Sequence, residues 1–176
     1  MTDTAESHST AVVDNEPTAK ATVCHRVGID FGMTICDMQH VDREPFEHAF
    51  STVKAITCRF GKENVFIVSK AKSETSSKIS LWLRDHCFFE ATGMLPSNVY
   101  FVREVADKRI VVEKLRLTMF IDDYFKVVKC LAVAPTLQTI VWFRGRKELL
   151  GQIEKPFRTK IVIAHRWGNV YKVFAK

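Results

Sequence analysis

What the sequence lacks sets the first limits on this chain of 176 residues. Its five cysteines, Cys24, Cys36, Cys58, Cys87 and Cys130, are odd in number and form no Cys-x-x-Cys motif. This pattern argues against a disulfide framework and a structural zinc site, and favours buried cysteines in a reducing compartment. No apolar stretch is long enough to span a membrane, and no basic start followed by an apolar core marks a secretory signal. We therefore expect a cytoplasmic protein with no membrane partner.

Long runs of one charge are also missing. The chain has 26 Lys and Arg against 20 Asp and Glu, a formal net charge of +6. A basic balance favours an anionic ligand such as phosphate or nucleic acid, although a solvated basic surface explains it as well. The positive residues are scattered, so charge alone predicts no nucleic-acid-binding stripe. One aromatic and basic patch, Trp-Phe-Arg-Gly-Arg at 142–146, could clamp a nucleic acid or be the solvated end of a strand.

Strand-like and helix-like segments alternate after a polar start. Residues 1–22 have the composition of a disordered tail, and residues 23–176 are long enough for a single domain with its own core. Apolar patterns predict strands at 23–31, 65–68, 99–102, 118–121, 139–143 and 160–164. They predict helices at 46–60, from an N-cap at Ser73, and at 108–115, 124–132, 147–153 and 169–175. This alternation predicts a three-layer α/β/α Rossmann-like fold with a mostly parallel sheet.

Polar residues at the ends of these elements carry the clue to function. Asp30 ends one buried strand, and Asp122 with Asp123 ends another. Because an unpaired buried carboxylate is costly, we expect these acids at the open carboxyl edge of the sheet, where ligands bind. Ser69 ends a further strand and Lys108 begins a helix; each alone could be a cap, a turn or a solvated residue. Together they provide what phosphoryl transfer through an aspartyl-phosphate requires.

With these residues the chain resembles the haloacid dehalogenase-like (HAD) superfamily, in particular a small branch without a cap domain. The matching motifs are Asp30-Phe31-Gly32-Met33-Thr34, Phe66-Ile67-Val68-Ser69, a lysine before the acidic strand, and Phe120-Ile121-Asp122-Asp123. Lys108 fits the lysine best, with Lys114 and Lys70 as alternatives. The resemblance implies a Mg²⁺-dependent hydrolase of the phosphatase type, acting on a phosphorylated substrate of unknown identity.

The resemblance also assigns roles. Asp30 would attack phosphorus, and Ser69 and Lys108 would hold the phosphoryl oxygens. Asp30, the backbone carbonyl of Gly32, Asp122 and Asp123 would bind Mg²⁺, which prefers oxygen ligands.

One position departs from the superfamily pattern. Gly32 stands where phosphatases of the superfamily carry a second Asp that protonates the leaving oxygen, and such help is typically worth ~10²–10⁴-fold in rate. The alternative is therefore a catalytically impaired protein that binds phosphate or nucleic acid. Asp37, His40 and Asp42 could lend a proton, or they form an ordinary solvated loop.

The gaps between the motifs predict an open site. Residues 32–45 leave room for a small flap only, and residues 70–107 are taken up by expected elements. In the superfamily, a site without a cap domain is typical of members that act on large phosphorylated substrates such as proteins or nucleic acids. An open site would need shielding from water by a partner or an oligomer, and the oligomeric state stays open.

Overall fold

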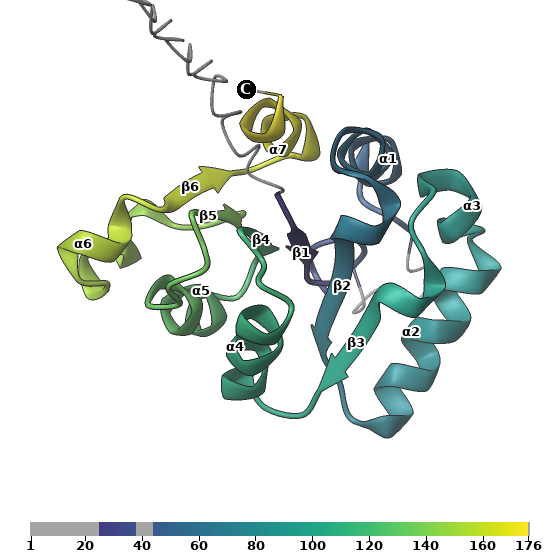
Figure 1. Ribbon diagram of the computed structural model, residues 1–176, viewed down its shortest axis with the longest axis horizontal. Coiled ribbons are helices and arrows are strands. Elements are labelled where there is room, and N and C mark those ends of the chain that lie inside the picture. Colours follow the sequence, from purple (N-terminus) through teal and green to yellow (C-terminus); the bar gives the residue numbers. More distant parts are fainter. Residues whose placement is uncertain (1–24, 38–43, 176) are drawn as a thin grey trace, which may run out of the picture.

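The computed structural model describes residues 25–37 and 44–175. Within them the chain forms one six-stranded sheet (Figure 1). The strands are β1 (Val27–Ile29), β2 (Val65–Lys70), β3 (Val99–Val102), β4 (Met119–Asp122), β5 (Thr139–Phe143) and β6 (Ile161–Ala164). The expected tail at 1–22, together with His40 and Asp42, lies outside the described residues.

The sheet is parallel throughout, in the order β3-β2-β1-β4-β5-β6. From β1 the chain adds two strands on one side and then returns to add three on the other. β1 and β4 therefore form the point at which the strand order reverses. In open α/β sheets, ligands bind outside the carboxyl ends of the strands at such a point.

Helices cover both faces of the sheet, as Figure 1 shows. On one face lie α1 (Ala49–Phe60), α2 (Ser73–Asp85), α3 (Phe88–Thr92) and α7 (Trp167–Phe174). On the other lie α4 (Val105–Lys114), α5 (Phe125–Ala132) and α6 (Lys155–Arg158). Short 3₁₀ helices, η1 (Lys62–Asn64), η2 (Pro96–Asn98) and η3 (Lys147–Gln152), complete the connections. The predicted three-layer, Rossmann-like α/β/α architecture is confirmed.

The helix α1 illustrates how the sequence specifies this packing. Its buried residues include Ala49, Val53 and Ile56, whose spacing places them on one helical face. The helix ends before Gly61, which has a φ of 87°, a backbone conformation that glycine adopts without steric cost.

The centre of the sheet is packed on both sides. Ile29 and Ile121, paired across β1 and β4, face the helices α1 and α7, whereas Phe120 faces α4 and α5. Gly28 allows Phe120 to lie against β1, because a Cβ at this glycine would come within 2.4 Å of the Phe120 ring. The glycine is therefore a packing requirement directly beneath the end of β1.

Several boundaries differ from those predicted from the sequence. The strands β3 and β5 match the predicted ranges, but α3 was not predicted. Ser73 is not the N-cap of α2: Lys72 takes that position, and the Ser73 carbonyl accepts hydrogen bonds from the hydroxyls of Ser76 and Ser77. The helix α4 begins at Val105 rather than at Lys108, because a capping box between Glu104 and Asp107 starts it earlier.

No cap-sized insertion occurs in the described part of the chain. After β1, Gly32 pairs with Cys36, and Cys36 with Pro45, so this segment folds back on itself. Between β2 and α4 the chain is used by α2, α3 and β3. Among the described helices, none combines the length and the apolar character needed to cross a bilayer.

Candidate active site

Strand register brings the first two acids together. Ile29 of β1 pairs with Ile121 of β4, and the Asp30 amide donates to the Ile121 carbonyl at 2.9 Å. Asp30 and Asp122 each follow one of these isoleucines. Since side chains alternate along a strand, both acids point toward the α4 side of the sheet.

Lys108 of α4 lies between these two carboxylates. Its Nζ is 2.6 Å from Asp30 Oδ1 and 2.7 Å from Asp122 Oδ2, and the side chain is only 2% exposed. Burial by itself lowers the pKa of Lys108, but the two carboxylates outweigh this, and the pKa is raised above its ordinary value. Lys108 is therefore a fixed positive charge at the end of β1 and β4.

Asp122 is fully buried and has both oxygens engaged. Oδ2 accepts from Lys108, and Oδ1 accepts from the Tyr124 amide at 2.9 Å. Burial raises the pKa of Asp122 to about 7; Lys108 opposes this effect, and the nearby charge of Asp30 adds to it. The carboxylate is crowded by negative charge and would gain from a further cation.

Asp123 is held by a chain of hydrogen bonds from distant segments. The Thr34 hydroxyl donates to Asp123 Oδ1 at 3.2 Å, and the Trp142 indole donates to the Asp123 carbonyl at 2.9 Å. The Trp167 indole donates in turn to the Thr34 carbonyl at 3.0 Å. Burial and then the charge of Asp30 raise the pKa of Asp123 to about 6.

Asp30 differs from Asp122 in having an oxygen that accepts no hydrogen bond from the described residues. Its Oδ1 accepts from Lys108, and no hydrogen bond to Oδ2 is formed within the described residues. Its side chain is 10% exposed, whereas that of Asp122 is inaccessible. Of this pair, Asp30 is therefore the carboxylate that can meet a ligand.

These groups surround a cavity of about 270 Å³. All the site residues predicted from the sequence line it: Asp30, Gly32, Ser69, Lys108, Asp122 and Asp123. Lys70 and Tyr124 also line it, whereas Lys114 and Asp37 do not. Lys108 therefore lies at the cavity and Lys114 does not. Asp37 does not form part of the cavity wall either.

Two contributors were not predicted from the sequence. Thr34 belongs to the first motif, but its contact with Asp123 depends on the path of the chain after β1. Trp167 is 133 residues from Thr34 in sequence, and no local pattern could reveal that its indole positions Thr34.

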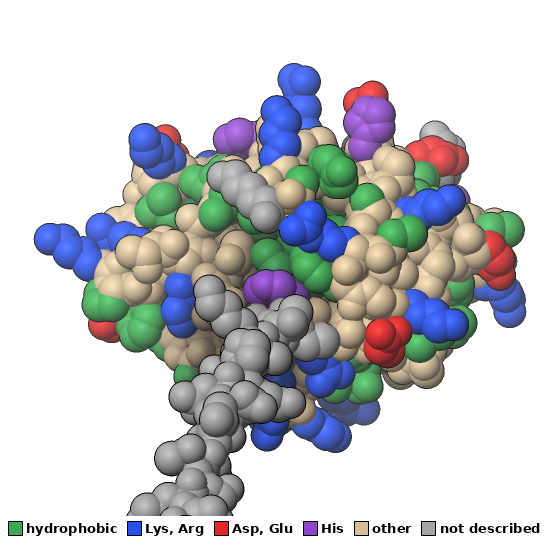
Figure 2. Space-filling view, turned by 45° about the horizontal axis from the view of Figure 1, so that its top comes forward, with side chains coloured by type: hydrophobic (Ala, Val, Ile, Leu, Met, Phe, Trp, Pro, Cys, Tyr) green, Lys and Arg blue, Asp and Glu red, His purple; other side chains and the backbone are tan. Residues whose placement is uncertain are grey.

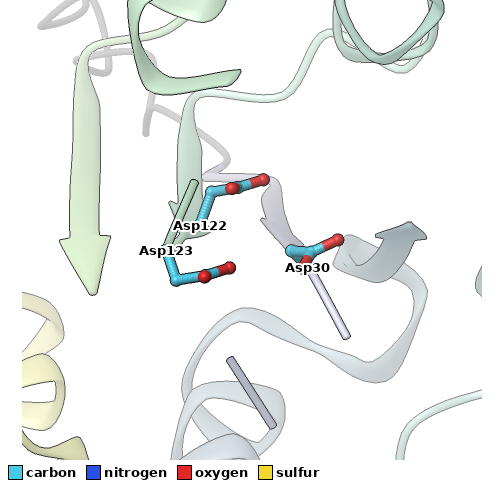
Figure 3. Close-up of side chains that lie close together, drawn as sticks. All are labelled: Asp30, Asp122 and Asp123. Atoms are coloured by element: carbon cyan, nitrogen blue, oxygen red, sulfur yellow. The ribbon is translucent and has the colours of Figure 1, made fainter. Parts of the chain in front are cut away.

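The three acids form a donor set that suits a hard divalent cation. Asp30, Asp122 and Asp123 each offer one carboxylate oxygen, and these oxygens lie within 4.8 Å of one another. Figure 3 shows the three side chains gathered around the same space, two from β4 and its end and one from the end of β1. Three ionised carboxylates and one ammonium leave a local charge of −2, which a divalent ion would neutralise. The residues therefore fit Mg²⁺, which prefers oxygen ligands.

The fold is similar to that of a magnesium-binding phosphatase. The crystal structure of D,D-heptose 1.7-bisphosphate phosphatase from B. bronchiseptica, complexed with magnesium and phosphate, superposes with a TM-score of 0.59. It covers 86% of this chain and 98% of that chain at 8% sequence identity, so the likeness concerns the fold. A de novo designed Rossmann 3x3 fold protein matches with a TM-score of 0.49 at 10% identity, covering 85% and 92% of the two chains. No protein-family model matches the sequence, and no curated protein matches it either.

Proposed function

We propose that the protein is a Mg²⁺-dependent phosphoester hydrolase that acts through an aspartyl-phosphate. The observation that carries this proposal is the position of Asp30: one oxygen is fixed by Lys108 and the other is free at a cavity that also holds the candidate metal ligands. Ser69, 3% exposed and at the same cavity, supplies a hydroxyl for a phosphoryl oxygen. The HAD-like fold, shared with a phosphatase, supports the same reading.

The reaction follows from these placements. The free oxygen of Asp30 attacks phosphorus, and the bond from phosphorus to the leaving oxygen breaks as the new bond forms. Water then attacks the phosphorus of the aspartyl-phosphate, which releases inorganic phosphate and regenerates Asp30. Lys108 and the Ser69 hydroxyl hold the phosphoryl oxygens and stabilise their charge during both steps. Bound Mg²⁺, held by Asp30, the Gly32 carbonyl, Asp122 and Asp123, would supply further positive charge.

The test is a panel of phosphomonoesters assayed with Mg²⁺, comparing the natural protein with Asp30→Asn. We expect Asp30→Asn to abolish turnover, with a loss of at least ~10⁴-fold, because the asparagine amide cannot form an acyl-phosphate. Asp85→Asn is the matched control, since Asp85 is a surface acid at the end of α2. Equal activity of the natural protein and Asp30→Asn would overturn the proposal.

A second candidate function is phosphate binding without turnover, and Gly32 is the observation that favours it. The residue lines the cavity but has no side chain to protonate a leaving alkoxide, so solvent would have to do so. If only this group is missing, Gly32→Asp should raise phosphatase activity by ~10²–10⁴-fold. A natural protein that already turns over at ordinary rates, ~1–10³ s⁻¹, would exclude the binding-only reading.

A further inference from the structure

A second cavity opens at the same edge of the sheet, beyond β5 and β6. Its volume is about 440 Å³. We call it the basic cavity and define it by six of its lining residues: Phe46, Phe143, Arg144, His165, Arg166 and Lys172. The proposed hydrolase leaves this cavity unused.

The basic cavity concentrates positive charge that nothing in the described structure neutralises. Arg144, Arg166 and Lys172 form no ion pair within the described residues. One acid, Glu47, also lines the wall, and it lies 3.3 Å from His48 rather than beside these cations. Figure 2 shows Lys and Arg side chains scattered over one face of the molecule without forming a stripe. The basic cavity is distinguished by being hollow as well as cationic.

Arg144 is held in place rather than free in solvent. It has a φ of 55°, which is uncommon for a residue with a side chain. Its amide donates to the Ala164 carbonyl at 2.7 Å, which joins the end of β5 to the end of β6. Its guanidinium lies 4.7 Å from the centre of the Phe46 ring. A stacked guanidinium is pre-organised to receive a planar or tetrahedral anion.

The backbone beside these cations is accessible. In the first turn of α7, the side chain of the N-cap residue Arg166 makes no capping hydrogen bond. A Cβ placed on Gly168 would have no atom within 4 Å, so nothing blocks the approach of a ligand to that turn. The positive end of the α7 helix dipole adds to the attraction that the three cations exert on an anion.

The two cavities lie on one rigid frame. All strands are parallel, so Asp30 after β1, Arg144 after β5 and Arg166 after β6 lie at the same edge. Neighbouring strands are ~4.8 Å apart, which separates the basic cavity from Asp30 by about 10–15 Å along the edge. The hydrogen bonds from Trp167 to Thr34 and from Thr34 to Asp123 join the two directly.

We infer that the basic cavity binds a second phosphate group of the substrate whose first phosphate is at Asp30. This inference rests on the proposed function for the first phosphate and adds the substrate class: a molecule with two phosphates at least about 10–15 Å apart, since the two cavities also lie towards opposite faces of the sheet. A linear small-molecule bisphosphate and a short phosphorylated nucleic acid both have this chemistry.

The test uses α,ω-alkane bisphosphonates of increasing chain length, because their carbon–phosphorus bonds resist hydrolysis. Binding to the natural protein with Mg²⁺ is compared with that of alkyl monophosphonates of the same length. We expect one range of lengths to bind about 10- to 100-fold tighter than the monophosphonates, the usual gain from charge-assisted hydrogen bonds to a phosphate. The double variant Arg144→Gln, Arg166→Gln should abolish this gain.

Arg103→Gln is the matched control for charge. Arg103 is exposed at the same edge and follows β3, which lies two strands from β1 on the opposite side from β5. We expect this variant to keep the full preference for bisphosphonates. Lys172 lies in α7, and Lys172→Gln should weaken the preference for bisphosphonates without changing the turn at Arg144. This variant tests the basic cavity even if the double variant does not fold. Absence of the preference, or equal losses in Arg103→Gln and the basic-cavity variants, would overturn the inference.

Two further outcomes separate the inference from the proposed function and identify the source of the second phosphate. If phosphomonoesters are hydrolysed but bisphosphonates bind no tighter than monophosphonates, the role of the basic cavity is rejected and the proposed hydrolase stands. If bisphosphonates bind tighter but no phosphomonoester is hydrolysed, the proposed hydrolase is rejected and the basic cavity stands. With 5′-phosphorylated oligothymidylates, affinity that keeps rising with length and falls steeply with salt would identify a nucleic acid. Affinity that stops rising once the oligothymidylate is long enough to reach the basic cavity would identify a small molecule.

Discussion

Two groups of charged residues at one edge of the sheet differ in how their charge is compensated. At the ends of β1 and β4, Lys108 and the acids Asp30 and Asp122 are buried and bonded to one another. At the ends of β5 and β6, Arg144 and Arg166 are exposed and unpaired within the described residues. Removing the partner of a buried charge lowers the stability of the fold, because the remaining charge is left uncompensated. An exposed charge is compensated by solvent.

We therefore expect the buried group to determine the stability of the fold and the exposed group to determine anion binding. Substitutions among the acids and Lys108 should change the free energy of unfolding even without a ligand. Substitutions in the basic cavity should change anion binding and leave the fold almost unaffected.

The largest effect is expected from Lys108→Met. Removing the ammonium leaves two buried carboxylates unpaired, which should lower the free energy of unfolding by about 3–5 kcal/mol. The measurement is urea unfolding at pH 8 with EDTA, where the acids of the unfolded chain are ionised and no metal replaces the lysine.

Lys114→Met is the control for Lys108→Met, because it makes the same change at the exposed end of the same helix. It should alter the free energy of unfolding by less than about 0.5 kcal/mol. Adding Asp122→Asn to Lys108→Met should recover part of the loss, since one buried negative charge is then removed. Equal stabilities of the two lysine variants would show that the ion pairs do not support the fold.

The next largest effect is expected from Gly28→Ala beneath the acids. The new Cβ would meet the Phe120 ring at 2.4 Å and the Leu117 side chain at 2.7 Å. Overpacking of this kind costs about 1–3 kcal/mol, measurable by thermal or urea unfolding. Gly168→Ala, beside the basic cavity, is the control: it meets nothing within 4 Å and should be neutral or slightly stabilising. A Gly28→Ala protein as stable as Gly168→Ala would contradict this account of the central packing.

The contrast between the two regions also explains what the sequence could predict. Asp30, Ser69 and the pair Asp122–Asp123 stand at or next to the ends of strands with clear apolar patterns, and parallel strands bring such ends to one edge, where Lys108 reaches them from α4. The sheet architecture and the set of residues at the cavity were therefore predictable, and every predicted site residue lines it. Their chemical roles stay predictions until activity is measured.

The basic cavity could not be predicted in the same way. Its residues come from the start of α1, the end of β5 and the β6–α7 connection, which have no common local pattern. For the patch at 142–146 the sequence alone leaves two alternatives, the clamping of a nucleic acid and the solvated end of a strand. The structure divides it: Trp142 is buried and holds the Asp123 carbonyl, while Arg144 stacks on Phe46. Only tertiary contacts show that Trp142 is buried next to Asp123 while Arg144 lies on Phe46.

A pH effect should distinguish the acidic group further. The pKa values of Asp122 and Asp123 are raised to about 7 and about 6 in the folded protein, from an ordinary value of 3.8. Between pH 4 and 7 the folded state therefore binds more protons than the unfolded state, and the metal-free protein should lose stability as the pH rises. The slope is at most about 1.4 kcal/mol per pH unit for each proton.

Mg²⁺ should reverse this trend, because it binds the ionised carboxylates. The stabilisation by Mg²⁺ should grow as pH rises from 5 to 8, as followed by urea unfolding with and without EDTA. Asp122→Asn should flatten the metal-free slope and weaken the response to Mg²⁺, whereas Arg144→Gln should change neither. A metal-free slope of the opposite sign would contradict the burial of these acids as the cause.

The smallest effect is expected from Arg144→Gly. Arg144 has a φ of 55°, and glycine relieves the cost of that conformation while losing the contact with Phe46. Arg116 is the matched control: it has a φ of 51° after α4, exposed and without a ring contact in the described structure. Both changes add the same freedom to the unfolded chain, so that term cancels when the two are compared. Arg144→Gly should therefore be less stable than Arg116→Gly by the value of an exposed cation–π contact, about 0.5–1 kcal/mol. A difference of zero in urea unfolding would mean that Phe46 does not hold the Arg144 guanidinium, and the pre-organisation assigned to the basic cavity would then be lost.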